Sequence, residues 1–239
     1  KFGDLVGQVA DIGLKQGMFT NGYLLDRCMD QVLDNFTFVR VSLDAGSAAT
    51  HEQMHDVKNH YNKILDNIRT LRSKRDGAFP TIGIQFAVHH LNIKDLRPSV
   101  LASKELGVDY FSIKPVFNRG SVGLRIPKNQ LTEADLSPLA MEIQQEFSSP
   151  GFTVYYRPHQ IGNEVADENL LEYRHCVAGF FNLQIYEDGR VVTCGPGQIC
   201  VGTVNDDVGE IQERIFQGYQ KLDLTNCPAG CRYHALNHM

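Results

Sequence analysis

The sequence lacks a long apolar run, a basic cluster and the common nucleotide and hydrolase motifs. No stretch approaches the roughly 20 apolar residues of a membrane span, so we expect no membrane partner. The net charge is −5, and the sequence has no run of Lys and Arg that could contact a phosphate backbone. Both observations argue against a nucleic-acid partner. Gly-x-Gly-x-x-Gly, P-loop and Gly-x-Ser-x-Gly patterns are absent, so nothing points to those nucleotide sites or to serine hydrolysis.

Cysteine is also scarce, and its distribution is uneven. Six cysteines in 239 residues are too few for a disulfide scaffold, and five of them follow residue 175. A chain of this length buries a core without cross-links. With no signal-peptide pattern, a reduced, cytoplasmic setting with thiolate ligands is favoured, and a disulfide-bonded tail is the alternative.

The spacing of four late cysteines predicts a metal centre. Cys176 and Cys194 flank two β-rich runs joined by Asp188-Gly189, which favours a hairpin with a type I′ turn, whose two central residues both have positive φ. The hairpin would bring both cysteines to its open end, where Cys227 and Cys231 can join them. Four converging thiolates are an iron–sulfur or a zinc ligand set.

Iron–sulfur is the favoured metal, and zinc is the rival. Structural zinc sites usually have short Cys-x(2–4)-Cys pairs in both halves, and here only Cys227 and Cys231 form one. Cys200 is either an alternative ligand or, as we prefer, a small buried residue. Cys28 is expected in the core, on an amphipathic helix.

The first two-thirds of the chain alternate helix and strand patterns. We expect helices at 2–12, 24–33, 50–72, 94–106 and 131–147 and strands at 18–20, 36–43, 81–88, 110–116 and 152–157. Strands separated by single helices predict right-handed βαβ units and a parallel sheet. Ligands of such sheets bind beyond the carboxyl ends of the strands.

With these elements placed, the chain resembles the radical S-adenosylmethionine (radical SAM) superfamily with a C-terminal Twitch or SPASM-type auxiliary-cluster region. Cys176-x12-Gly189-x4-Cys194 fits the opening of the auxiliary pattern, and Cys227-Pro-Ala-Gly-Cys231 is similar to its end. Further matches to the family's third to sixth barrel strands follow in order along the chain: Phe19–Gly22, Val41–Gly46, Ile82–Asn92 and Tyr110–Pro115.

The family's Cys-x3-Cys-x2-Cys, which holds the cluster that cleaves SAM, is absent from this sequence. The segment after Lys1 resembles the helix that follows the family's second strand. We therefore expect an N-terminally incomplete enzyme, with a natural degenerate homologue as the alternative. The expected domains are a partial α/β barrel at 1–161 and a small cluster domain at 162–239.

The resemblance implies two [4Fe–4S] clusters in the complete protein, SAM, and an electron donor such as a flavodoxin or ferredoxin. Reductive cleavage of SAM would give a 5′-deoxyadenosyl radical that abstracts a substrate hydrogen, and the auxiliary cluster would take or relay an electron. We expect an oxidoreductase acting on a small polar substrate of the sugar, aminocyclitol or nucleoside type. The alternatives are a peptide-modifying maturase and a non-catalytic scaffold with a Cys₄ metal site.

SAM in this family lies across the carboxyl ends of the strands, where its polar groups need hydrogen-bonding partners. The residues expected to supply them are Thr20, Asn21, Ser42, Asp44, Gln85 and Asn92. Lys114 is expected to bind the substrate. The alternatives are a turn at Asn21, a cap or loop role for Asp44 and a surface position for Lys114.

Overall fold

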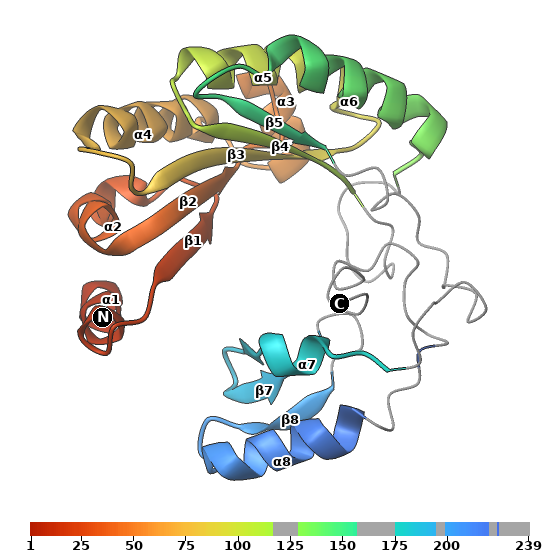
Figure 1. The fold of residues 1–239 in the computed structure, drawn as a ribbon. Helices are drawn as coiled ribbons and strands as arrows, with labels where there is room; N and C mark the ends of the chain where they lie inside the picture. The colour runs from red at the N-terminus through yellow and green to blue at the C-terminus, as the bar shows by residue number, and fades with distance from the viewer. Residues whose placement is uncertain (117–128, 157–174, 195–198, 220–223, 225–239) are drawn as a thin grey trace. The chain divides into compact units, whose positions relative to one another are not determined.

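The computed structural model divides the chain into two compact units, Lys1–Pro158 and His159–Met239 (Figure 1). It describes residues 1–116, 129–156, 175–194, 199–219 and 224. The expected domain boundary near Gly162 lies outside these residues, and so do Cys227 and Cys231.

The first unit is built on a five-stranded sheet. Its strands lie in chain order and every neighbouring pair is parallel: β1 (Gln16–Thr20), β2 (Phe36–Ser42), β3 (Thr81–Val88), β4 (Tyr110–Pro115) and β5 (Thr153–Tyr156). The expected parallel α/β sheet is therefore confirmed. All five carboxyl ends lie at one edge, because neighbouring strands run the same way.

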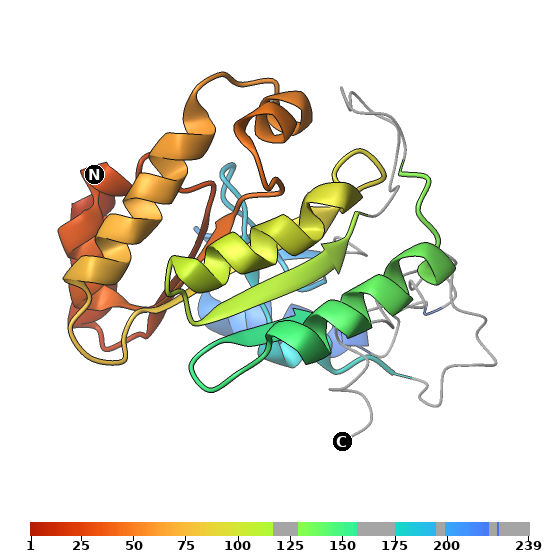
Figure 2. The same cartoon turned by 90° about the horizontal axis from the view of Figure 1, so that it is seen from above.

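Helices cover one face of this sheet (Figures 1 and 2). The helical elements of the unit are α1 (Phe2–Asp11), η1 (Leu25–Arg27), α2 (Met29–Asn35), α3 (Ala48–His55), α4 (His60–Lys74), η2 (Ile93–Asp95), α5 (Leu96–Glu105) and α6 (Glu133–Phe147). Figure 2 shows α4, α5 and α6 lying across the same side of the sheet. Within the described ranges, no helix has the length and apolar character needed to cross a membrane.

The core lies between that helical layer and the sheet. Alternate β3 residues Ile82, Ile84, Phe86 and Val88 are fully buried, and Val39 and Val41 of β2 are buried with them. Leu71 of α4 and Leu96 of α5 are also fully buried. Because side chains alternate along a strand, the residues between these point to the other face, which α4 to α6 leave open.

The single helix predicted over 50–72 is wrong, because the structure has two. Helix α3 ends at His55, and Asp56 and Asn59 both adopt positive φ, 54° and 59°. Asp and Asn enter this left-handed region more readily than most residues, and it is incompatible with a continuing helix. Helix α4 then begins at His60.

The helix predicted over 24–33 is also interrupted. A 3₁₀ turn, η1, ends before Cys28, whose φ of −137° separates it from α2. The Cys28 thiol lies 3.9 Å from the carbonyl oxygen of Leu24 and is half-buried. The prediction that Cys28 is a core residue of a continuous helix is therefore wrong.

The second unit contains a small antiparallel sheet covered by a helix. Its described elements are α7 (Ala178–Phe181), β6 (Gln184–Ile185), β7 (Arg190–Val192), β8 (Cys200–Thr203) and α8 (Val208–Tyr219). Val191, Val201, Ile211 and Ile215 form its core, so the apolar face of α8 packs on β7 and β8. The sheet order is β6-β7-β8.

The hairpin predicted around Asp188-Gly189 is present, but its turn is not type I′. Gly189 has φ of +83°, whereas Asp188 is not among the positive-φ residues. The Gly189 N–H donates to the Tyr186 carbonyl, and the Tyr186 N–H donates to the Arg190 carbonyl, both at 2.9 Å. These bonds define a three-residue loop with a glycine bulge, which needs only one residue in the left-handed region.

His51 is a buried histidine of α3 with an unusual titration. Its side chain is 3% exposed and lies between His55 and Tyr61, with ring centroids 4.6 and 5.9 Å away. Burial, together with the nearby imidazoles of His55 and His60, lowers the pKa of His51 to about 4. His51 is therefore neutral in the folded protein at neutral pH.

The depressed pKa of His51 predicts a loss of stability in mild acid. The unfolded chain binds this proton near pH 6.5, so stability should fall by about 1–3 kcal/mol as pH falls from 6.5 to 4. Urea unfolding at both pH values should show that the unfolding free energy of His51→Phe changes less between pH 6.5 and 4 than that of the wild type. The exposed His175→Gln change is the control. An undiminished difference in His51→Phe would reject this assignment.

Candidate functional site at the carboxyl edge of the sheet

A polar row crosses the open face of the sheet near its carboxyl edge. Ser42 pairs with Gln85, Gln85 with Ser112, and Ser112 with Tyr155 in the parallel register. Paired residues of parallel strands project to the same side, so four polar side chains from four strands lie in one line. The structure therefore brings the predicted ligand residues Ser42 and Gln85 together.

Aromatic side chains lie on the same face, closer to the amino ends of the strands: Tyr110 is one row and Phe38 two rows from the polar row. Phe38 lies over Gly17, whose added Cβ would be 2.0 Å from the Phe38 ring. Tyr110 lies over Gly83 in the same way, with 2.0 Å between an added Cβ and the ring. The two glycines thus let rings from neighbouring strands lie flat on the sheet. We call these rings the aromatic floor, because they cover the sheet backbone on the open face, on the amino-terminal side of the polar row.

Arg40, Phe19 and Tyr155 extend this floor. The Arg40 guanidinium lies 4.1 Å from the centroid of the Phe19 ring, and Phe19 lies 5.3 Å from Phe38. Tyr155 meets Tyr110 edge to face at 5.7 Å. These residues are not among the predicted site residues, although their alternation with buried positions along each strand indicates that the sheet has a second, open face.

Lys114 lies one pair further toward the carboxyl edge than this polar row. It pairs with Ala87, while Ser112 pairs with Gln85, so Lys114 is on the same open face and is half-buried. Its ammonium group is therefore placed on the side of the predicted ligand residues.

Asp44 follows β2 and is tied to the end of β3. Its backbone has φ of 55°, and its Oδ1 accepts the Ala87 N–H at 2.6 Å. Oδ2 lies 3.5 Å from Nε2 of His55. Burial raises the pKa of Asp44, while the Ala87 N–H and His55 act in the opposite direction. Asp44 thus lies at the carboxyl edge, and its carboxylate connects the segment after β2 to the end of β3.

The other predicted ligand residues at the edge make hydrogen bonds within the chain. Asn92 is fully buried, and its carboxamide bonds backbone groups of Asp44, Ala87 and His89. Thr20 pairs with Val41, on the helix-covered side, and accepts the Gly22 N–H. Asn21 accepts the Tyr23 N–H. Their roles toward a ligand remain predictions.

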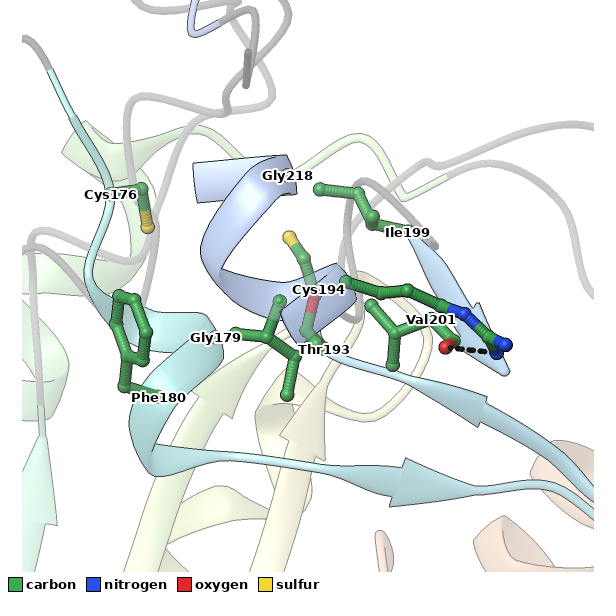
Figure 3. Close-up of a pocket in the computed structure, with 10 residues that line it drawn as sticks. Cys176, Gly179, Phe180, Thr193, Cys194, Ile199, Val201 and Gly218 are labelled. Carbon is green, nitrogen blue, oxygen red and sulfur yellow. Dashed lines mark hydrogen bonds between the residues drawn. The ribbon is translucent and has the colours of Figure 1, made fainter. Parts of the chain in front are cut away.

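Two of the predicted metal ligands line one pocket of the second unit (Figure 3). Cys176 precedes α7, and Cys194 follows β7. The pocket is otherwise mostly apolar, with Phe180, Ile199 and Val201 among its lining residues. Thiols facing an apolar cavity suit an iron–sulfur or zinc centre, since both bind thiolates and both are sensitive to the surrounding polarity.

Cys200 does not line this pocket. Its neighbour Val201 does, and successive strand residues face opposite sides. Cys200 is exposed, so the preferred prediction of a buried residue is wrong. Cys227 and Cys231 lie outside the described residues, and among the residues that are described no three His, Cys, Asp or Glu side chains are grouped to hold a metal.

The chain is similar in structure to solved proteins that were determined with bound SAM or bound peptides. Streptococcus suis SuiB bound to SAM superposes with a TM-score of 0.69 at 14% identity, over 99% of this chain and 60% of SuiB. SuiB bound to its precursor peptide SuiA gives 0.67 at 16% identity, over 99% and 59% of the two chains. The anSMEcpe structure with bound SAM and the Kp18Cys peptide gives 0.59 at 13% identity, over 85% and 59%.

These likenesses decide the architecture. The chain shares the α/β fold of these proteins, and its five-stranded parallel sheet is consistent with the partial barrel expected from the sequence. It spans about three-fifths of the length of these solved chains. No family model matches the sequence, and no curated protein matches it either.

The contact of Gly83 with Tyr110 predicts the effect of adding one methyl group. Gly83→Ala should lower the unfolding free energy by about 1–3 kcal/mol, because the Cβ would overlap the Tyr110 ring. In a Tyr110→Ala background, the same change should cost much less.

Gly7→Ala is the control for this glycine series. Gly7 lies within α1 with no atom within 4 Å of an added Cβ, so its replacement should stabilise the protein by up to about 1 kcal/mol. Chemical unfolding of the four variants measures both effects. An equal cost of Gly83→Ala with and without Tyr110 would contradict the described floor.

Proposed function

We propose that this chain is part of a SAM-dependent radical enzyme that binds SAM on the open face of the sheet, at its carboxyl edge. The observation that supports this most directly is the Ser42–Gln85–Ser112 row. It places polar groups on the face that α4 to α6 leave open, in a fold whose solved counterparts include SAM complexes. Under this proposal, the aromatic floor sets the depth of the ligand cavity.

In the proposed site, Ser42 and Gln85 hydrogen-bond polar groups of SAM, and Asp44 shapes the rim. The aromatic floor excludes water from below, because Phe38 and Tyr110 cover the sheet backbone at Gly17 and Gly83. Lys114 lies further toward the edge and holds a carboxylate or hydroxyl of the substrate. If bound to a reduced cluster, SAM would supply the radical that abstracts a hydrogen atom from the substrate.

The pocket of the second unit is proposed as an auxiliary [4Fe–4S] site. Cys176 and Cys194 supply two thiolates, and Cys227 and Cys231 complete the set. The apolar lining of the pocket would exclude water and so tune the potential of a bound cluster. A flavodoxin or ferredoxin type of protein is the proposed electron donor.

A peptide is the substrate class we favour within this proposal. Two of the solved counterparts are complexes with peptides, SuiB with SuiA and anSMEcpe with Kp18Cys. The open face also offers Phe19, Tyr110 and Tyr155, which suit contact with amino-acid side chains. No finding supports the sugar, aminocyclitol or nucleoside class that the sequence analysis preferred.

Ser42→Ala tests SAM binding at the proposed site. In the full-length protein, reconstituted with iron and sulfide without oxygen, we expect Ser42→Ala to weaken SAM binding by about three- to tenfold. This corresponds to the loss of one hydrogen bond. Titration calorimetry measures the dissociation constant, with Ser73→Ala on the outer surface of α4 as the matched control. Equal affinities in wild type and Ser42→Ala would place SAM elsewhere.

Iron analysis tests the auxiliary cluster. Cys176→Ser and Cys194→Ser should each lower iron by up to about four atoms per chain, because each removes a ligand. Cys28→Ser and Cys200→Ser should keep the wild-type content, because neither residue lines the pocket. Zinc in place of iron, or no loss in Cys176→Ser, would refute the iron–sulfur assignment.

A further inference from the structure

Three asparagines, Asn67, Asn92 and Asn129, hold the backbone at the carboxyl edge of the sheet. Each donates its side-chain N–H groups to two carbonyl groups at or near a strand exit. The strand ladders end at this edge, so these carboxamides take over hydrogen bonds that neighbouring strands no longer provide. A carboxamide suits this role because it carries donors and an acceptor on one rigid plane.

Asn92 joins the exits of β2 and β3. Its Nδ2 donates to the carbonyl of Asp44 at 2.9 Å and to that of Ala87 at 3.0 Å, while Oδ1 accepts the His89 N–H at 2.7 Å. Asp44 completes the connection, because its carboxylate accepts the Ala87 N–H. The turn after Ser42 is thereby fixed against the strand that carries Gln85.

Asn129 joins the exits of β3 and β4. Its Nδ2 donates to the carbonyls of Val88 and Val116, both at 3.2 Å, and its Oδ1 accepts the His90 N–H at 3.0 Å. The chain therefore returns to the end of β4 thirteen residues after leaving it at Val116. Lys114 lies two residues before this junction.

Asn67 acts in the same way on the exit of β1, from the helical layer. It lies on α4 and is 7% exposed, and its Nδ2 donates to the carbonyl of Gly22 at 2.8 Å and to that of Tyr23 at 3.2 Å. Together with Asn92 and Asn129, it means that asparagine side chains hydrogen-bond the backbone at the exits of β1 to β4.

We propose that these three asparagines are positioning residues for the ligand site. This proposal rests on the proposed function. They fix the spacing of the strand exits, so that Ser42, Gln85 and Lys114 meet a ligand together. Asn92, which the sequence analysis assigned to SAM itself, acts through Asp44 and Ser42 instead. Losing its carboxamide leaves the part-buried carbonyls of Asp44 and Ala87 without this donor and frees the β2 exit.

Titration calorimetry with SAM tests the proposal on the full-length, anaerobically reconstituted protein, well below its melting temperature. Asn92→Ala should weaken SAM binding by about tenfold or more, whereas Asn62→Ala, an exposed change on α4, should stay within about twofold. Asn92→Asp keeps the volume and the acceptor but loses both donors. It should show the same direction of change and serves as the test if Asn92→Ala does not fold.

A double-mutant cycle separates positioning from a general loss of stability. If Asn92 acts through Ser42, the combined loss in Asn92→Ala/Ser42→Ala should be clearly smaller than the product of the two single losses. Losses that multiply, or an Asn92 variant with wild-type affinity, would overturn the positioning role while leaving SAM binding intact. A wild-type protein that does not bind SAM would instead overturn the proposed function, and the inference with it.

Discussion

The parallel register of β2, β3 and β4 is the constraint on which the candidate site depends. It places Ser42 beside Gln85 and Gln85 beside Ser112, on the face that α4 to α6 leave open. A slip of one residue in β2 would put Val41 on this face and Ser42 in the core. The buried apolar residues that hold the register therefore also determine which polar groups meet a ligand.

The architecture was largely predictable from the sequence, because short apolar-rich strands alternate with single amphipathic helices along the chain. All five strands of the first unit were expected within a few residues of their observed bounds. The break between α3 and α4 was missed because apolar periodicity continues across it. The positive φ of Asp56 and Asn59 is a local backbone property that periodicity does not report.

The site was less predictable, because it depends on distances between residues far apart in the chain. The sequence showed that polar residues follow the strands, and Ser42 and Gln85 do lie together on the open face. It did not show that the Asn92 carboxamide bonds backbone groups rather than facing solvent. Nor did it reveal the aromatic floor, since Phe38 and Tyr110 depend on glycines of neighbouring strands.

The ligand edge of the first unit and the thiol-lined pocket of the second have one proposed chemistry in common, radical formation from SAM. The most direct test is to incubate the anaerobically reconstituted full-length protein with SAM and a strong reductant and to quantify 5′-deoxyadenosine by chromatography and mass spectrometry. The account predicts that 5′-deoxyadenosine forms in amounts that rise with protein concentration and need the reductant. A reconstituted, iron-loaded protein that yields none above the protein-free control would contradict it.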